Sequence, residues 1–169
     1  MNPTASVRAF VGVGANLGDA RAQVLAGIAA LRELPGVRLL ARSSLYASAP
    51  LEASGPDYVN AVVELDTTLP AAVLLRSLHA IEARHGRVRS TPNAPRTLDL
   101  DLLLYGEQRS DDPALTLPHP RLHQRAFVLK PLLEIAPQLQ VDGLGPLSSW
   151  LQKASDQAVR CLPGEELRR

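Results

Sequence analysis

The sequence predicts an α+β fold with a ferredoxin-like core, whose elements follow one another in the order β-α-β-β-α-β. Four segments alternate apolar and polar residues as half-buried strands do, and two carry apolar residues at helical spacing. In this order the strands form an antiparallel sheet with both helices on one face. Two apolar segments near the C-terminus are expected to cover the other face, which gives a three-layer αβα domain.

Turn-forming residues separate the predicted elements. Strands are expected over residues 8–14, 37–46, 58–66 and 98–105. Helices are expected over residues 19–34 and 70–85, because Pro35 and Gly36 end the first, and Pro70 and Gly86 bound the second. In the C-terminal part, residues 124–137 are expected to be helical in part, and residues 145–159 to form a further helix with Trp150 on its apolar side.

Length and composition indicate one domain, residues 1–169. A hydrophobic content of 46% and a formal net charge of +1 indicate neither a nucleic-acid nor a membrane partner. No apolar run approaches the ~20 residues of a membrane span, and the N-terminus lacks the pattern of a signal peptide. The single cysteine, Cys161, cannot form an internal disulfide. We expect a cytoplasmic monomer.

Two aspartates, Asp99 and Asp101, interrupt the last predicted strand. Alternation places both on one face, with Cα atoms roughly 6.5–7 Å apart. The leucines at alternate positions face the core: Leu100, Leu102 and Leu104. Like charges this close repel and raise each other's pKa, so a positive group is expected between them. Either arginines such as Arg96 form ion pairs with them, or they bind a divalent cation such as Mg²⁺, which prefers oxygen ligands.

A basic loop leads directly into this strand and contains or borders Arg84, Arg87, Arg89 and Arg96. A solvated basic loop is one interpretation. The other is a lid that neutralises a polyphosphate from the side opposite the metal, since arginine forms bidentate contacts with phosphate.

Three further patterns bear on ligand binding. The stretch GVGANLGD, residues 12–19, lacks both the dinucleotide fingerprint and the P-loop lysine, so it predicts a tight strand-to-helix turn with local hydrogen bonds from Asn16. Residues 116–127 contain a second basic cluster: His119, Arg121, His123 and Arg125. The cluster either consists of surface residues at a capped helix start or contacts a nucleotide; it suits metal binding less well. Tyr58 and Phe127 either belong to the core or enclose a flat ring whose polar edge Asn60 reads.

Taken together, these motifs resemble the 6-hydroxymethyl-7,8-dihydropterin pyrophosphokinase family. The resemblance runs from VGVGANLGD through SSLYASAPL, GPDYVNAVVEL and IEARHGRVR to APRTLDLDLLLYG and LPHPRLHQRAFVLKPLLEIAP, and covers nearly the whole chain. It implies transfer of pyrophosphate from ATP to the hydroxymethyl oxygen of the pterin, with release of AMP, in tetrahydrofolate biosynthesis. It also implies two Mg²⁺ ions bound with ATP.

The resemblance assigns roles to residues that match the family's motifs. Asp99 and Asp101 would hold the metal ions, and together with Arg87 and Arg96 they would form the catalytic set. The implied pterin contacts are Ser48, Ala49, Leu51, Tyr58, Asn60 and Phe127. The implied ATP contacts are Leu75, His79, Glu82, Arg89, Leu102, Thr116, His119 and Arg125.

Some positions depart from the family's pattern. The loop 89–96 lacks a tryptophan and is about one residue short, and His79 stands where glutamine is usual. Ala114 replaces an arginine, and Pro120 stands where some members have tyrosine. We expect altered ATP affinity rather than lost activity. Two alternatives share this fold plan: a two-metal nucleotidyl transferase or cyclase, which releases pyrophosphate, and a non-catalytic RNA-binding module, which needs aromatic residues on its central strands.

Overall fold

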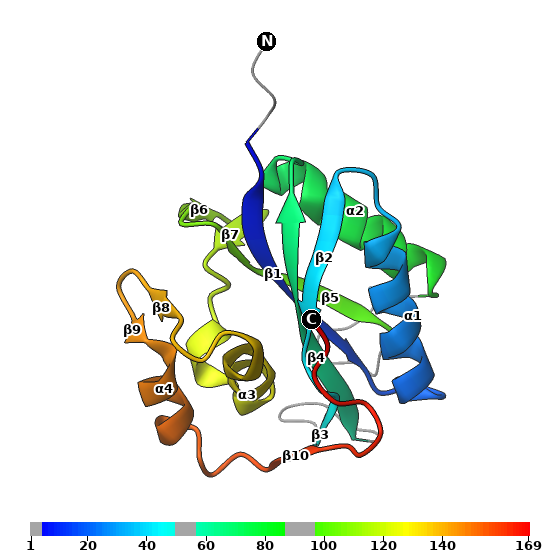
Figure 1. The fold of residues 1–169 in the computed structure, drawn as a ribbon, viewed down its shortest axis with the longest axis vertical. Helices are drawn as coiled ribbons and strands as arrows, with labels where there is room; N and C mark the ends of the chain where they lie inside the picture. The colour runs from blue at the N-terminus through cyan, green and yellow to red at the C-terminus, as the bar shows by residue number, and fades with distance from the viewer. Residues whose placement is uncertain (1–4, 50–56, 87–96) are drawn as a thin grey trace.

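A computed structural model of the chain describes residues 5–49, 57–86 and 97–169. Its main feature is an antiparallel sheet with the strand order β10-β3-β4-β1-β5, in which β2 also pairs with β4 (Figure 1). The strands are β1 (Val7–Ala15), β2 (Val37–Arg42), β3 (Tyr46–Ser48), β4 (Tyr58–Thr67), β5 (Asp99–Tyr105) and β10 (Val159–Cys161). The antiparallel core predicted from the sequence is confirmed.

Helices cover both faces of this sheet (Figure 1). The helices α1 (Ala20–Arg32) and α2 (Ala71–Arg84) lie on one face, and α3 (Ala126–Ile135) lies on the other with α4 (Leu147–Lys153) beside it. The predicted three layers are therefore confirmed. Within the described ranges no helix has both the length and the apolar character needed to cross a membrane.

Short elements connect these layers. A hairpin of β6 (Ser110–Asp112) and β7 (Leu115–Leu117) follows β5, and a 3-10 turn (Leu122–Gln124) precedes α3. A second small hairpin, β8 (Gln140–Val141) and β9 (Gly145–Pro146), precedes α4.

Each face of the sheet packs its own apolar cluster. The cluster under α1 and α2 includes Val13, Ile28 and Leu78, and the cluster under α3 includes Val62 and Leu129. All five side chains are at most 3% exposed, as expected when both faces of a sheet are covered. Trp150 packs against the α3 cluster, which confirms its place on the apolar side of its helix.

The prediction of one continuous strand over residues 37–46 was wrong. Residues 43–45 interrupt it, because the Ser43 side chain takes the place of a ladder carbonyl: its Oγ accepts a hydrogen bond from Val62 N at 2.9 Å, while Ser43 N donates to Val62 O at 2.9 Å. The chain therefore continues as two strands, β2 and β3, that both pair with β4.

The predicted helix over residues 145–159 was too long. The helix α4 ends at Lys153, and residues 159–161 form β10 beside β3. Beyond β10, Leu162 N donates to Leu45 O at 2.8 Å, and Arg168 exchanges two backbone hydrogen bonds with Arg42. We attribute the difference to the backbone edge beside β3, whose unpaired groups the C-terminal residues satisfy better than a helix would.

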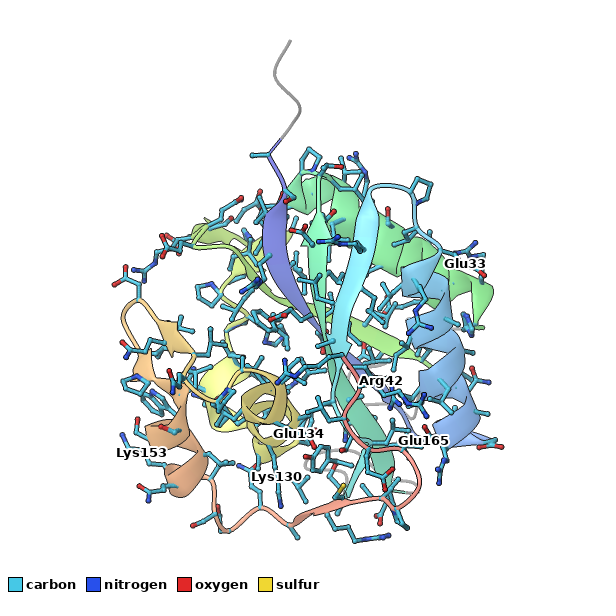
Figure 2. The ribbon with its side chains drawn as sticks, viewed as in Figure 1. Glu33, Arg42, Lys130, Glu134, Lys153 and Glu165 are labelled. Carbon is cyan, nitrogen blue, oxygen red and sulfur yellow. The ribbon has the colours of Figure 1, made fainter. Side chains whose placement is uncertain are left out.

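Charged side chains anchor this C-terminal segment and α3 (Figure 2). Arg42 is 5% exposed, and its Nη2 lies 3.5 Å from the Glu165 carboxylate. Glu134 of α3 accepts hydrogen bonds from both Ser44 N and Ser44 Oγ, each at 2.7 Å. This side of the sheet is thus closed by paired polar groups.

A β-bulge in β5 changes which residues face which layer. The register to β1 shifts so that Phe10 pairs with Leu104 and Val11 with Leu102, which leaves Leu103 as the extra residue. Leu104 consequently joins the α3 cluster together with Leu103. The prediction that Leu104 shares a face with Leu102 was therefore wrong.

Candidate active site

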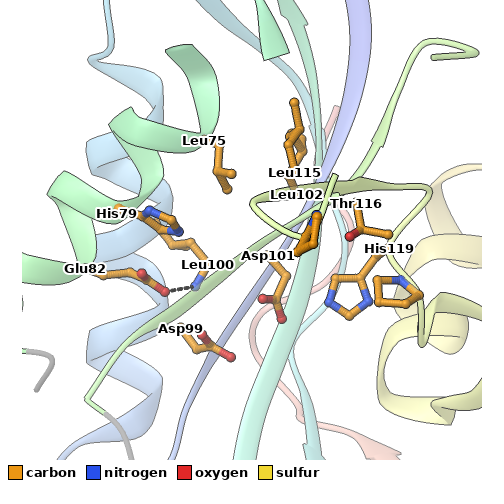
Figure 3. A pocket seen from close by; sticks show the side chains of 12 residues that line it. Leu75, His79, Glu82, Asp99, Leu100, Asp101, Leu102, Leu115, Thr116 and His119 are labelled. Atoms are coloured by element: carbon orange, nitrogen blue, oxygen red, sulfur yellow. Dashed lines mark hydrogen bonds between the residues drawn. The ribbon is translucent and has the colours of Figure 1, made fainter. Parts of the chain in front are cut away.

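The two aspartates of β5 lie on one side of their strand, as the alternation predicted (Figure 3). Asp99 pairs with Gly14 and Asp101 with Gly12 on β1, while Leu100 and Leu102 point into the core under α1 and α2. Both carboxylates are partly exposed and line a cleft of about 280 Å³. The two negatively charged side chains therefore face the same open cleft.

Helix α2 forms one wall of this cleft. Leu75, His79 and Glu82 are spaced four and three residues apart, so they share one face of the helix. The opposite wall comes from β7 and the segment after it, through Thr116 and His119 (Figure 3). The remaining lining residues are Leu100, Leu102, Pro113, Leu115 and Pro120.

Glu82 holds the outer edge of β5. Its side chain is 2% exposed, and its Oε2 accepts a hydrogen bond from Leu100 N at 2.9 Å (Figure 3). Since β5 is the last strand of the sheet on this side, that N–H has no neighbouring strand to bind. A carboxylate acceptor makes the bond strong, so Glu82 fixes the strand that carries both aspartates.

His119 contributes a neutral hydrogen-bond donor. Burial is the main reason that its pKa is lowered to about 4; the nearby Arg125 charge lowers it further, and Asp99 opposes the shift. Its Nδ1 accepts a hydrogen bond from Arg121 N at 3.2 Å, which leaves the proton on Nε2. At neutral pH the ring therefore offers one N–H and carries no charge.

A second group of predicted residues lies on β3 and β4. Asn60 Nδ2 donates to Ser48 Oγ at 2.9 Å, and both residues are 5% exposed. Tyr58 pairs with Ser48 across the two strands and shares a face with Asn60. Phe127 lies on α3, where the Arg125 guanidinium is 5.5 Å from the centre of its ring.

A row of paired residues links this group to the carboxylates. Asn60 on β4 pairs with Gly14 on β1, and Gly14 pairs with Asp99 on β5. Neighbouring strands are about 4.8 Å apart, so the Cα atoms of Asn60 and Asp99 are roughly 10 Å apart with no side chain between them. Asn60 and Asp99 thus lie on the same face of the sheet, on either side of Gly14, the position of β1 that carries no side chain.

The glycines of GVGANLGD serve two parts of the chain. Gly12 and Gly14 lie inside β1, and only Gly18, with a φ of 61°, occupies the turn before α1 in a left-handed conformation. Asp19 then caps α1, because its Oδ1 accepts a hydrogen bond from Ala22 N at 3.1 Å. The predicted strand-to-helix turn is therefore confirmed for its last residues.

The structure brings together most, but not all, of the predicted site residues. The predicted ATP contacts that line the cleft are Leu75, His79, Glu82, Leu102, Thr116 and His119. Arg125 acts on the cleft through its charge on His119, and Ala49 is exposed just after β3. His123 instead packs edge-on against Trp150, with ring centroids 4.7 Å apart. Four predicted residues lie outside the described ranges: Leu51, Arg87, Arg89 and Arg96.

Sequence reasoning missed three lining residues, Leu100, Pro113 and Leu115, and it named a fourth, Pro120, only as a departure from the family's pattern. Leu100 was assigned to the core, where its side chain does lie, and it reaches the cleft because β5 is an edge strand. Pro113 and Leu115 belong to the β6–β7 hairpin, whose only sequence signal is a pair of very short polar and apolar runs.

The carboxylates fit the metal that the resemblance implies. Within the described part of the chain no three His, Cys, Asp or Glu side chains gather as a metal site. Of the acidic residues that line the cleft, Glu82 is nearly buried and accepts a hydrogen bond from Leu100 N, whereas Asp99 and Asp101 are partly exposed and suit a metal. Mg²⁺ is commonly held by one or two carboxylates, with phosphates and waters completing its shell. The donor set suits Mg²⁺ that arrives with a nucleotide rather than a closed structural site.

Fold and cleft together define a ferredoxin-like α+β protein with a carboxylate pair on its edge strand. The family described as 7,8-dihydro-6-hydroxymethylpterin-pyrophosphokinase (HPPK) matches residues 10–137, and the chain belongs to this family. A 2-amino-4-hydroxy-6-hydroxymethyldihydropteridine pyrophosphokinase of Pseudomonas aeruginosa is 45% identical over 158 residues, covering 93% of this chain and 98% of the relative. That of Haemophilus influenzae is 42% identical over 154 residues, covering 90% and 96%.

Solved structures agree with the fold. The chain is similar to a crystal structure of Plasmodium falciparum HPPK-DHPS with pterin and p-hydroxybenzoate, with a TM-score of 0.71 at 12% sequence identity. The match covers 90% of this chain and 44% of that chain, so this protein spans less than half of that two-part polypeptide. At this identity the likeness confirms the ferredoxin-like three-layer fold alone.

Proposed function

We propose that the protein transfers pyrophosphate from ATP to 6-hydroxymethyl-7,8-dihydropterin, giving AMP and the pterin diphosphate, as a step of tetrahydrofolate biosynthesis. The observation that carries this proposal is the row Asn60, Gly14 and Asp99 on three adjacent strands. In this row a neutral amide, which suits a heterocycle, lies on the same face of the sheet as a carboxylate pair, which suits a metal-bound polyphosphate. Membership of the HPPK family supports the same reaction.

The residues of the cleft bind and orient the nucleotide. Leu75 and Leu102 supply apolar surface for a purine, and Thr116 supplies a hydroxyl. Asp99 and Asp101 would hold Mg²⁺, and we assign two ions to the complex with ATP. When bound, Mg²⁺ neutralises charge on the triphosphate and makes the β-phosphorus a better electrophile.

His119 is suited to contact a phosphate oxygen through its Nε2 proton. A neutral donor adds no charge that would compete with the metal for the carboxylates. Arg87 and Arg96 are proposed to contact the phosphates from the other side. The chemistry is therefore one of positioning and charge stabilisation. The pterin hydroxyl oxygen attacks the β-phosphorus and releases its proton to solvent, while the bond from the β-phosphorus to the α–β bridging oxygen breaks and AMP leaves with that oxygen.

The pterin is proposed to lie between β4 and α3. Asn60 offers an amide that complements the amide-like edge of the ring, and Tyr58 and Phe127 offer aromatic faces. The pterin contacts proposed for Ala49 and Leu51, the ATP contacts of Arg89 and Arg125, the monomeric state and the cytoplasmic location stay predictions.

The identity of the nucleotide product tests this proposal. The wild-type protein is incubated with ATP, Mg²⁺ and 6-hydroxymethyl-7,8-dihydropterin, and the nucleotides are separated by chromatography. We expect AMP in a one-to-one ratio with pterin diphosphate and none without pterin. ADP would indicate transfer of a single phosphate, and free pyrophosphate would favour the nucleotidyl transferase or cyclase alternative; either result would overturn the proposal.

A further inference from the structure

The Asn60 carboxamide is held in place by its neighbours on both sides. Its Nδ2 donates to Ser48 Oγ at 2.9 Å, and both residues are almost fully buried on the strands β4 and β3. Within the described residues this is the one hydrogen bond of the Asn60 side chain. Its Oδ1 and the second Nδ2 proton therefore remain for a ligand.

Gly14 limits the carboxamide from the other side. A Cβ atom at Gly14 would stand 2.9 Å from Asn60 Oδ1, closer than Cβ atoms approach other atoms in proteins. The φ of Gly14 is not in the left-handed region, so backbone conformation does not require glycine here. Glycine is needed here because it has no side chain: Asn60 Oδ1 occupies the space that a Cβ atom at Gly14 would fill.

We propose that Gly14 and Ser48 are positioning residues that fix the orientation of the Asn60 carboxamide and thereby set the affinity for the heterocyclic substrate. The inference rests on the proposed function and extends it to Gly14 and to the hydroxyl of Ser48, neither of which needs to touch the ring itself. An amide presents a donor and an acceptor side by side, and it recognises a lactam edge only in one of its two flipped orientations. Ser48 and the bare Gly14 select that orientation before the substrate binds, so none of the binding free energy is spent on ordering it.

Gly12 offers a matched control for Gly14. It lies on the same strand two residues earlier and faces the same layer, yet a Cβ atom there would meet Leu103 side-chain atoms at 3.6–3.8 Å. That is an ordinary van der Waals distance. The substitutions Gly14→Ala and Gly12→Ala therefore add the same methyl group to the same strand, but only the first displaces Asn60.

The experiment measures KM for the pterin and KM for ATP separately in each variant. We expect Gly14→Ala and Ser48→Ala to raise the pterin KM about tenfold, the effect of one lost hydrogen bond in a buried site. The KM of these two variants for ATP should stay within about twofold of wild type. The same holds for the pterin KM of Gly12→Ala and for that of Ser48→Thr, which retains the hydroxyl. Calorimetric titration of the pterin, in the presence of Mg²⁺ and a non-hydrolysable ATP analogue, should show the same loss.

A double variant separates this mechanism from general damage. In Gly14→Ala/Asn60→Ala the carboxamide is absent, so the added methyl should cost nothing beyond Asn60→Ala alone. Additive losses, equal losses for ATP and pterin, or an unchanged pterin KM in Gly14→Ala would overturn the inference. If Gly14→Ala does not fold, the pair Ser48→Ala and Ser48→Thr decides it, and failure of Ser48→Thr to restore affinity would count against it. A wild type that forms AMP shows that the proposed function stands whatever these variants do.

Discussion

Two glutamates on different helices each receive a backbone N–H from the sheet, but in contrasting surroundings. Glu82 of α2 accepts from Leu100 at the outer edge of β5, beside the open cleft. Glu134 of α3 accepts two hydrogen bonds from Ser44, in the segment between β2 and β3. It also interacts with the Tyr46 hydroxyl, whose pKa is raised by burial and by this carboxylate.

The contrast shows that the β3 side and the β5 side of the candidate active site are built differently. On the β3 side the C-terminal segment closes the sheet, and the proposed pterin contact Asn60 is neutral and held by a hydrogen bond to Ser48. On the β5 side the edge stays open, and two carboxylates line a cleft where a cation and phosphates are proposed to bind. Fixed geometry suits a small heterocycle, whereas a pair of partly exposed carboxylates suits a substrate that brings its own cations.

The largest expected effect comes from removing charge on the open side. Asp99→Asn and Asp101→Asn should each lower the rate of AMP formation at least about 10³-fold, because each removes half of the negative charge that we propose holds Mg²⁺ with the ATP phosphates. Without divalent ions, the temperature of thermal unfolding should change little, because both side chains are partly exposed. Loss of activity accompanied by a lower melting temperature would indicate a structural role instead. The exposed Asp156 supplies the control, Asp156→Asn.

The carboxylate pair was predictable because charge inside an apolar strand is visible in the sequence. The spacing of Asp99 and Asp101 determines their shared face in any strand, whatever it pairs with. Gly14 and Asn60 are different. They share a row only through the pairing of β1 with β4, and that register depends on contacts between residues far apart in the chain.

The fold shows the same division. Alternation and turn residues predicted the order of the four main strands and two helices, since those signals are local. The break at Ser43 depends on one hydroxyl that replaces a carbonyl in the ladder, and β10 depends on the free edge of β3. Neither the break at Ser43 nor β10 produces a periodic pattern of apolar residues in its own segment, so the sequence did not predict them.

On the closed side, Glu134→Ala should produce the largest loss of stability. It leaves Ser44 N and Ser44 Oγ without their acceptor, and hydrogen bonds to a charged group contribute about 1.5–3 kcal/mol each. We expect the free energy of unfolding in urea to fall by about 3 kcal/mol, and by less for Glu134→Gln, which keeps an acceptor. Glu33→Ala, at an exposed position (Figure 2), should change it by less than about 0.5 kcal/mol. A Glu134→Ala protein as stable as wild type would contradict this account.

On the open side, Glu82→Ala should lower the free energy of unfolding by less, about 1–3 kcal/mol, because Glu82 Oε2 accepts a hydrogen bond from the Leu100 backbone N–H at the edge of the sheet. It should also lower the rate of AMP formation, since β5 carries both aspartates, and Glu82→Gln should recover much of both losses. Urea unfolding and the product assay measure the two effects. If Glu82→Gln retained stability but lost activity as fully as Glu82→Ala, the carboxylate would act on the substrate directly rather than through Leu100.

The smallest effect concerns His119 and appears only as a pH dependence. Its pKa is lowered from 6.5 to about 4 in the folded protein, so between these values the unfolded chain binds a proton that the folded protein does not. Stability from this residue is therefore complete above pH 6.5 and falls as the pH drops towards 4. In the absence of nucleotide and divalent ions, the free energy of unfolding of wild type should decline more steeply over this range than that of His119→Gln, which cannot titrate. Parallel curves would mean that the ring is as accessible to protons in the folded protein as in the unfolded chain, and that the cleft wall formed by His119 is open to solvent.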